Sequence, residues 1–360
     1  MIELNGLNVS EQQKNIILDK MDEMGHEQVL FCRDKKTGLR AIIAIHDTTM
    51  GPSLGGVRMW DYKNELQAVE DVLRLSRGMT YKAAISGLEL GGGKAVIIGN
   101  ANTDKSEALL RRFGQFVESL GGRYITAEDV NMSPKDMEYI KMETNHVTGT
   151  DVSLGGSGDP SPVTAYGVYM GMKASAMYRW GSDSLAEKTI LVQGIGHVGE
   201  YLVEHLAKEN ANILINDINE QRLEEVSEKY GAKIVKGNGI YDLEIDIYAP
   251  CALGATLNSD TIARLKCEIV AGSANNQLAD EQIHANQLKE RAIIYAPDFL
   301  INAGGLINVY SEIKGFSRDI ALEKTKNIYN TTLEILNKAE QDGVTTNQAA
   351  IGIAQERLGA

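Results

Sequence analysis

Residues 191–199 read LVQGIGHVG, and this stretch decides the fold of the second half of the chain. An apolar strand is expected before the first glycine, and apolar residues at helical spacing follow the last one. A second expected strand, residues 213–216, leads into Asp217, 18 residues after Gly199. This order of strand, glycine-rich turn, helix, strand and acidic residue predicts a Rossmann dinucleotide-binding unit.

The glycine motif has a physical role at each position. Gly194 permits a tight turn, Gly196 lets the backbone approach a pyrophosphate, and Gly199 lets the helix pack closely on the strand. The helix N-terminus offers N–H groups to phosphates, while Asp217 accepts hydrogen bonds from the adenosine ribose and repels a 2′-phosphate. NAD is therefore predicted rather than NADP, and the turn residues expected to bind it are Gly194, Ile195, Gly196, His197, Val198 and Gly199. The alternative is a glycine turn within an ordinary βαβ unit.

Strand-like and helical segments alternate along the whole chain. The expected strands are residues 40–46, 95–98, 124–127, 213–216, 245–249, 268–271 and 293–296. The expected helices are residues 65–77 (ending at Gly78), 106–120, 164–180, 317–341 and 348–358. Strands separated by helices indicate parallel pairing with helices on both faces. We predict an α/β fold with two domains, residues 1–150 and a Rossmann domain at 151–340, a cleft between them, and a C-terminal helix at 341–360 packing back on the first domain.

The composition is that of a soluble protein with an excess of acidic residues. The chain has 360 residues, a net charge of −13 and 36 glycines. This balance argues against nucleic acid or an anionic membrane as a partner, because either needs a basic surface. The three cysteines are scattered without a CxxC pair, so neither a disulfide framework nor a metal site is expected. The chain has no apolar run of about 18 residues and no signal-like start, and a cytoplasmic location is predicted.

Two lysines and an aspartate are candidates for the reacting centre. Lys82 follows GMTY, and Lys94 follows three glycines and opens an apolar run. Partial burial would lower the pKa of a lysine and make it a base near neutral pH, and a second ammonium group could hold a carboxylate. Asp129 ends an expected strand, where α/β sheets place their chemistry. The alternatives are two surface lysines and a helix-capping aspartate.

Nine segments carry a resemblance to a known family. They are AIIAIHDTT (41–49), GPSLGGVRM (51–59), GMTYK (78–82), GGGK (91–94), YITAED (124–129), PSPVTA (160–165), APCALG (249–254), GSANNQ (272–277) and INAGG (301–305). On these segments the chain resembles the glutamate/leucine/phenylalanine/valine amino-acid dehydrogenases, and within that family it is most similar to the members that act on leucine. The resemblance implies reversible oxidative deamination of an L-amino acid to its 2-oxo acid, ammonium and NADH.

The resemblance also implies roles for individual residues. Lys82 would bind the substrate carboxylate, Lys94 would act as general base on the attacking water, and Asp129 would assist proton transfer at the amino group. The first domain would bind substrate, carry the catalytic residues and mediate oligomerisation, with the site in the cleft between domains. Gly55, Gly56 and Asn276 would line the approach. The remaining residues that the family pattern places at the cofactor are Cys251, Ala252, Ala274, Asn275, Asn276 and Asn302.

The substrate side chain is expected to lie in an apolar pocket. Its family positions fall on Leu54, Met79, Ala127, Leu306 and Val309. A lysine grips the side-chain carboxylate in the glutamate-specific relatives, and Leu54 stands there in this chain, so glutamate is excluded because its carboxylate would be buried unpaired. Leu306 and the segment 129–131 resemble the aromatic-type members instead. We predict a branched-chain substrate, leucine with valine and isoleucine, and an aromatic amino acid as the alternative.

Three other classes of protein fit the sequence less well. A catalytically silent NAD-binding regulator could lack either lysine or Asp129, and all three are present. A 2-hydroxy-acid dehydrogenase would need a histidine base beside an acid, a setting that His205 and His284 lack. A zinc alcohol dehydrogenase would need a Cys/His ligand set, which is missing. The family implies a homo-oligomer, either a dimer or an octamer.

Overall fold

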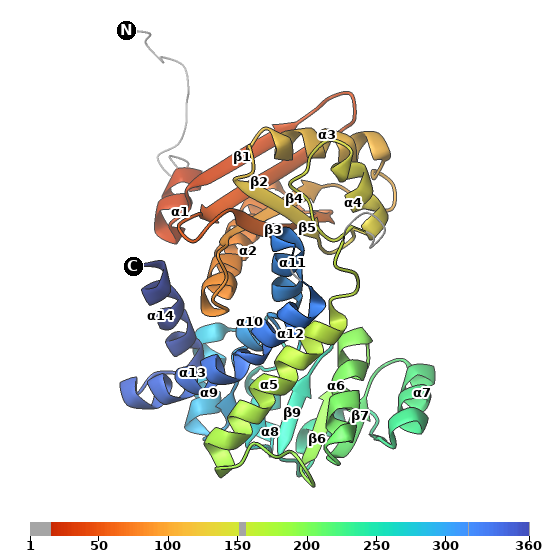
Figure 1. Ribbon diagram of the computed structural model, residues 1–360, viewed down its shortest axis with the longest axis vertical. Helices are drawn as coiled ribbons and strands as arrows, with labels where there is room; N and C mark the ends of the chain where they lie inside the picture. Colours follow the sequence, from red (N-terminus) through yellow and green to blue (C-terminus); the bar gives the residue numbers. More distant parts are fainter. Residues whose placement is uncertain (1–15, 151–155, 316, 360) are drawn as a thin grey trace. The chain divides into compact units, whose positions relative to one another are not determined.

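The computed structural model describes residues 16–150, 156–315 and 317–359, which divide into two compact units (Figure 1). The first unit contains the described residues up to Thr80 together with Leu90–Val147. The second contains Tyr81–Glu89 and the described residues from Thr148 onward. The division therefore falls inside one helix, α2 (Glu65–Ile85). The domain boundary expected at residue 151 falls on residues 151–155, which lie outside the described residues.

The first unit is built on a five-stranded mixed sheet. The strand order is β1-β2-β4-β3-β5, in which β1–β2 and β2–β4 are antiparallel and β3 is parallel to both β4 and β5. The strands are β1 (Gln28–Arg33), β2 (Arg40–Asp47), β3 (Ser53–Trp60), β4 (Gly91–Ile98) and β5 (Tyr124–Glu128). The three strands expected in this part of the sequence are confirmed, whereas β1 and β3 were not predicted.

Helices cover both faces of this sheet. On one face α3 (Glu107–Glu118) and α4 (Pro134–Lys141) bury residues such as Phe113 and Met137 against alternate strand positions. On the other face α2 packs Val69 and Val72 against the intervening positions, with α1 (Ile16–Met24) beside it. Because side chains alternate along a strand, each position of β3 and β4 faces either α3 or α2.

The helix predicted to end at Gly78 continues for two more turns, so that prediction is wrong. Helix α2 runs through Gly78 to Ile85, and Ala83, Ala84 and Ile85 are fully buried. Glycine lowers helix stability by about 1 kcal/mol relative to alanine, and burial of the last turn outweighs this. Met79 and Lys82 consequently project from a helix rather than from a loop.

The second unit contains a six-stranded parallel sheet with the order β11-β10-β9-β6-β7-β8. The strands are β6 (Thr189–Gln193), β7 (Asn212–Asn216), β8 (Lys233–Ile234), β9 (Ile247–Pro250), β10 (Ile269–Val270) and β11 (Ile294–Tyr295). Renumbered within the unit, this is the Rossmann order 3-2-1-4-5-6, with the strand order reversing between β6 and β9. The predicted doubly wound fold is confirmed, and ligands of such sheets bind outside the carboxyl ends of the strands at this reversal.

Helices flank this sheet on both faces as well. Helix α5 packs against α6, α10, α11, α12 and α13, while α8 and α9 cover the opposite face beside Tyr248 and Val270. The helices are α5 (Ser161–Trp180), α6 (His197–Lys208), α7 (Glu220–Tyr230), α8 (Ser259–Arg264), α9 (Glu281–Glu290), α10 (Asp298–Ile301), α11 (Gly304–Lys314), α12 (Arg318–Lys326), α13 (Ile328–Asp342) and α14 (Thr346–Leu358). Among the described residues, no helix has both the length and the apolar character that a membrane crossing requires.

The C-terminal helix α14 packs on α13 and α9. Near its end, Arg357 donates hydrogen bonds to the carbonyl oxygens of Ala84 (3.2 Å) and Ile85 (2.6 Å), at the end of α2. A cation at a helix C-terminus satisfies carbonyl groups that have no partner within the helix. The packing of residues 341–360 on the first domain stays a prediction.

Two glycine-to-alanine variants test how closely α2 approaches the sheet. A Cβ at Gly92 would lie 2.2 Å from the backbone nitrogen of Thr80, whereas a Cβ at Gly78 would meet no described atom within 4 Å. We expect Gly92→Ala to destabilise the protein by about 1–3 kcal/mol and Gly78→Ala to stabilise it by up to about 1 kcal/mol. Denaturant unfolding followed by circular dichroism measures both. Equal stability of Gly92→Ala and the wild type would contradict the packing described.

Candidate functional site

Lys94 lies inside the first unit, on the face of β4 that packs against α2. Its neighbour Ala95 belongs to the core under α3, while Val96 belongs to the core under α2, so Lys94 shares the face of Val96. Only 7% of Lys94 is exposed, and its Nζ forms an ion pair with Oδ2 of Asp129. Asp129 directly follows β5, as the sequence predicted. The structure therefore brings together two of the three predicted catalytic residues.

Glycines on β3 and β4 make room for this pair. A Cβ at Gly56 would lie 2.7 Å from Cβ of Asp129, and a Cβ at Gly55 would lie 1.6 Å from the carbonyl oxygen of Gly93. Any side chain at Gly56 would thus push Asp129 away from Lys94. Tyr124 packs its ring on Gly93 and donates a 2.6 Å hydrogen bond to the carbonyl oxygen of Gly55. Gly55 and Gly56 thus allow the strands to come this close, and their place beside the substrate stays a prediction.

Burial and charge act in opposite directions on the pair. Burial lowers the pKa of Lys94, and the attraction of Asp129, which raises it, offsets only part of that effect. For Asp129 burial raises the pKa, but the charges of Lys94 and Arg58 outweigh burial and hold the pKa below its usual value. A lysine with a lowered pKa next to an ionised carboxylate is suited to act as a general base.

The sequence analysis missed three further members of this cluster, Arg58, Asp71 and Tyr62. Nε of Arg58 lies 3.3 Å from Oδ2 of Asp129, and Nη1 of Arg58 donates to Oδ2 of Asp71 at 3.0 Å. The hydroxyl of Tyr62 donates a 2.6 Å hydrogen bond to the same oxygen of Asp71. The available signal was Arg58 itself, a charged residue between the fully buried Val57 and Met59 of one strand.

A second set of predicted residues meets in the second unit. Nζ of Lys82 donates to Oδ1 of Asn302 at 2.6 Å. The amide of Asn302 donates in turn to Oδ1 of Asn275 at 2.7 Å and to the carbonyl oxygen of Ser273 at 3.1 Å. The residue predicted to hold the substrate carboxylate is therefore linked through one side chain to a residue predicted to hold the cofactor. Asn276, the next residue, has a left-handed backbone with φ of +51°.

Asp298 is a buried acid that the sequence analysis also missed. Its carboxylate accepts hydrogen bonds from the backbone N–H groups of Gln277 (3.0 Å) and Phe299 (2.7 Å). Burial raises the pKa of Asp298, and these hydrogen bonds and the charge of Lys82 oppose the rise. Asp298 thereby ties the loop that carries Asn275 and Asn276 to the start of α10.

The turn after β6 fits a dinucleotide. Gly194 has φ of +101°, and a Cβ there would lie 2.6 Å from the backbone nitrogen of Ala252, which follows β9. A Cβ at Gly199 would lie 2.0 Å from the carbonyl oxygen of Gly194, so only glycine allows α6 to start so near the turn. Gly196 caps α6 without a side-chain hydrogen bond, which leaves the first N–H groups of the helix to a ligand.

Asp217 lies at the end of β7 beside this turn. One of its carboxylate oxygens accepts a 2.7 Å hydrogen bond from the N–H of Ile195, and the other accepts a 2.9 Å bond from the N–H of Asn219. The acid is thus fixed next to the glycine turn, and its binding of a ribose stays a prediction. The other predicted cofactor residues lie in the loops that follow β9 and β10: Cys251 and Ala252, and Ala274, Asn275 and Asn276. His197 is exposed at the start of α6.

The predicted substrate pocket has members in both units. On β3 and β5, Leu54 is buried and Gly56 is the register partner of Ala127, while Met79 projects from α2. Leu306 and Val309 lie one turn apart on α11. That these five residues form one pocket stays a prediction.

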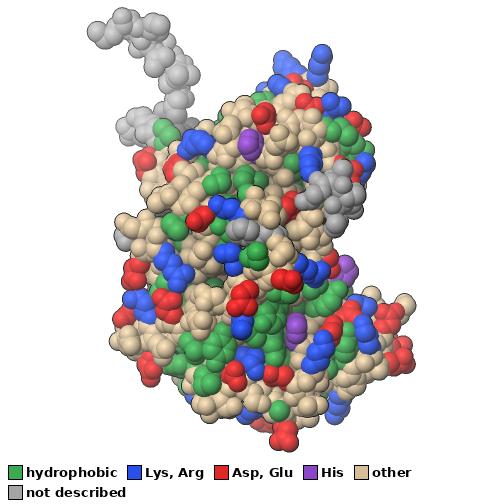
Figure 2. Space-filling model, in the orientation of Figure 1, with side chains coloured by type: hydrophobic (Ala, Val, Ile, Leu, Met, Phe, Trp, Pro, Cys, Tyr) green, Lys and Arg blue, Asp and Glu red, His purple; other side chains and the backbone are tan. Residues whose placement is uncertain are grey.

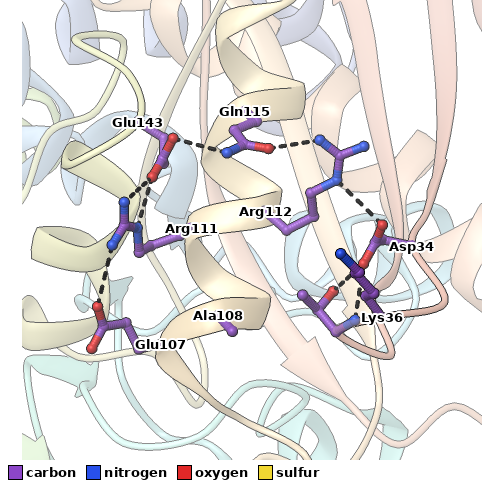
Figure 3. A pocket seen from close by; sticks show the side chains of 9 residues that line it. Asp34, Lys36, Glu107, Ala108, Arg111, Arg112, Gln115 and Glu143 are labelled. Atoms are coloured by element: carbon purple, nitrogen blue, oxygen red, sulfur yellow. Dashed lines mark hydrogen bonds and ion pairs between the residues drawn. The ribbon is translucent and has the colours of Figure 1, made fainter.

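A further cavity of the first unit is lined by charged side chains that pair with one another. The cavity, of about 650 Å³, lies beside α3 and the turn after β1, and Figure 3 shows its charged side chains directed at one another. Arg111 pairs with Glu107 and Glu143, and Arg112 with Asp34. Figure 2 shows acidic and basic side chains interspersed over the visible face. The described residues contain no cluster of three His, Cys, Asp or Glu that could hold a metal ion.

The strand order and the glycine turn define the second unit as a doubly wound dinucleotide-binding domain. Two family models match the chain: "Glu/Leu/Phe/Val dehydrogenase, dimerisation domain" over residues 26–146, and "Glutamate/Leucine/Phenylalanine/Valine dehydrogenase" over residues 155–219 and 215–359. The chain belongs to this dehydrogenase family, which confirms the resemblance seen in the sequence.

Individual relatives are similar to this chain over nearly its whole length. Leucine dehydrogenase of Thermoactinomyces intermedius is 52% identical over 342 residues, covering 95% of this chain and 93% of the relative. L-tryptophan dehydrogenase of Nostoc punctiforme is 48% identical, covering 95% and 96%. The crystal structure of L-tryptophan dehydrogenase from Nostoc punctiforme superposes with a TM-score of 0.87 at 47% identity, over 95% of this chain and 98% of that one.

The link between Lys94 and Asp129 can be tested without turnover. Replacing Asp129 by asparagine removes the negative charge that supports the ammonium form, so the pKa of Lys94 should fall further below its ordinary value. The pH dependence of Lys94 acetylation by acetic anhydride, followed by peptide mass spectrometry, measures this pKa. The control Glu128→Gln removes the preceding acid and should leave it unchanged. An unchanged or raised pKa of Lys94 in Asp129→Asn would contradict the geometry.

Proposed function

We propose that this protein catalyses the NAD-dependent oxidative deamination of a branched-chain L-amino acid, leucine with valine and isoleucine, and the reverse reductive amination. The products of deamination are the 2-oxo acid, ammonium and NADH. One observation carries the proposal: the buried Lys94 is ion-paired with Asp129 in a chain that also holds a dinucleotide-type glycine turn. Burial lowers the pKa of such a lysine and favours the neutral form that a general base needs.

Each charged residue has a task in this proposal. Lys82 holds the substrate carboxylate, and Asn302 keeps its ammonium group in place. Asp129 takes a proton from the substrate ammonium and later returns one to the departing nitrogen. Lys94, in its neutral form, removes a proton from the water that attacks the imino carbon. Lys94 belongs to the first unit and Lys82 to the second.

The glycine turn, Asp217 and Asn275 are the groups that would hold the cofactor, and nicotinamide, when bound, supplies the acceptor for the hydride of the substrate α-carbon. Asp217 supports NAD over NADP, because a 2′-phosphate beside its carboxylate would be repelled. The hydrogen bond from the N–H of Ile195 keeps that carboxylate at the turn.

A branched-chain substrate is supported by sequence similarity and by the residues at the family's side-chain positions. The leucine dehydrogenases of Thermoactinomyces intermedius and Bacillus subtilis are 52% identical to this chain, whereas the phenylalanine dehydrogenase of Bacillus thermotolerans is 48% identical. Asn131 favoured an aromatic substrate in the sequence. It has φ of +61° and donates to the carbonyl oxygen of Met59 at 3.0 Å, so its identity is explained by the backbone. An aromatic substrate remains the alternative.

We also propose that the chain forms a homo-oligomer, a dimer or an octamer, and acts in the cytoplasm on free amino acids, 2-oxo acids and ammonium. The description of the matched first-unit family as a dimerisation domain supports the oligomer.

The proposal predicts the outcome of a substrate panel. NADH formation at 340 nm is measured with leucine, isoleucine, valine, phenylalanine, tryptophan and glutamate, each with NAD and with NADP, for the wild type and for Lys94→Ala. Leucine with NAD should give the highest kcat/KM, glutamate none, and Lys94→Ala should lose about 10²–10⁴-fold. Arg74→Ala, an exposed change on α2, serves as the control. Dominant turnover of phenylalanine or tryptophan would favour the aromatic alternative, and no turnover of any substrate would refute the proposed activity.

A further inference from the structure

We propose that Arg58 is a positioning residue for the Lys94–Asp129 pair: anchored by Asp71, it holds the Asp129 carboxylate and allows Lys94 to work as a neutral base. This inference rests on the proposed function for its kinetic readout. It concerns the first unit alone, in which all of these residues lie.

Two cations share one carboxylate oxygen. Oδ2 of Asp129 is the atom that pairs with Nζ of Lys94, and it is also the atom 3.3 Å from Nε of Arg58. The side chains of Arg58 and Asp129 are 22% and 20% exposed, so water screens their attraction only in part. Arg58 therefore competes with Lys94 for the same negative charge.

This competition matters because the two cations differ in acidity. Arginine keeps its charge at every pH at which an enzyme works, whereas a buried lysine can lose its proton. With Lys94 as its only partner, Asp129 would hold that lysine in the ammonium form. With Arg58 present, the carboxylate keeps a cation on Oδ2 after Lys94 becomes neutral, so loss of the lysine proton leaves no unpaired buried charge.

Arg58 is itself held in place from the far side. Nη1 of Arg58 donates to Oδ2 of Asp71 at 3.0 Å, and the hydroxyl of Tyr62 donates to the same oxygen at 2.6 Å. Asp71 stands on α2 and Arg58 on β3, so this bridge fixes the guanidinium between helix and sheet. Two contacts hold the guanidinium itself, one to Asp71 and one to Asp129, and Tyr62 holds Asp71 in place. A flexible surface arginine has no such fixed orientation.

The charges around Lys94 predict opposite effects for Arg58 and Asp71. The positive charge of Arg58 lowers the pKa of Lys94, and the negative charges of Asp129 and Asp71 raise it. Asp129, Arg58 and Asp71 are the charges that act most strongly on Lys94. The other ionisable residues of the elements packed around it include Tyr124 and Glu128 on β5, His46 and Asp47 on β2, and Glu70, Arg74 and Arg77 on α2. A neutral substitution at Arg58 should thus raise the pKa of Lys94, and one at Asp71 should lower it.

A cavity beside this bridge offers a direct chemical test. It has a volume of about 470 Å³ and is lined by Arg58, Trp60, Tyr62, Gln67, Asp71 and Val130. Truncation of Arg58 to alanine would enlarge it where the guanidinium stood. A free guanidinium ion is small enough to enter and to pair with the Asp71 and Asp129 carboxylates.

The experiment compares Arg58→Ala, Asp71→Asn and the control Arg74→Ala, whose side chain touches the same Asp71 from the exposed side of α2. Two readouts are taken: the pKa of Lys94 from acetylation with acetic anhydride, and the rising limb of kcat/KM for leucine against pH. In Arg58→Ala the pKa of Lys94 and the rising limb of kcat/KM should both move up by about one pH unit. At pH values below this pKa, kcat/KM should therefore be about tenfold lower than in the wild type. Millimolar guanidinium chloride should reverse both shifts in Arg58→Ala alone, with sodium chloride as the ionic-strength control. In Asp71→Asn both should move down.

The outcomes separate this inference from the proposed function. Unchanged Lys94 titration in Arg58→Ala, or equal shifts in Arg58→Ala and Asp71→Asn, would overturn the role of Arg58. Absence of leucine turnover in the wild type would refute the proposed function, while the acetylation readout would still decide whether Arg58 tunes Lys94. If Arg58→Ala fails to fold by circular dichroism, Asp71→Asn, which keeps the side-chain volume, decides by the direction of its shift.

Discussion

A lysine buried in a β-sheet is the constraint around which the first unit is built. Burying an unpaired ammonium group there would cost more free energy than the fold can offset, so Lys94 needs Asp129 within contact distance. Glycines on β3 and β4 remove the side chains that would keep Asp129, α2 and Tyr124 away. The same closeness brings Arg58 and Asp71 to the pair. The groups that permit the burial of Lys94 thus also act on its charge, and Lys94 is the residue proposed as the base.

The second unit contains the residues proposed to hold the substrate carboxylate and the cofactor. The turn at Gly194 lies against the residue after β9, at the point where the strand order reverses. Asn302 connects Lys82 to Asn275, so the proposed carboxylate grip and the proposed cofactor loop share one amide. A single amide presents its oxygen to the ammonium and its N–H groups to Asn275, and this fixes its orientation.

Local patterns predicted the features that depend on neighbours in the sequence. The turn at residues 194–199, Asp217 at a strand end and Asp129 after β5 follow from spacing alone. Helix α2 was predicted too short, because the burial of Ala84 and Ile85 outweighs the propensity of Gly78. Arg58 and Asp71 were missed because their pairing depends on β3 lying between β4 and β5 with α2 across that face, an arrangement that no short segment encodes. Asp298 was missed because its partner, the N–H of Gln277, lies 21 residues away in the sequence and comes close only in the folded second unit.

The most direct test of the account is to compare two values in the wild-type protein. The pKa of Lys94 can be followed by NMR with ¹³Cε-labelled lysine, assigned with Lys94→Ala, and compared with the pKa that governs the rise of kcat/KM for leucine in the same buffer. The account predicts that the two agree and lie below the ordinary lysine value of 10.5, because burial outweighs the attraction of Asp129. A Lys94 that titrates at 10.5 or above, or a kinetic pKa unrelated to it, would contradict the assignment of Lys94 as the base.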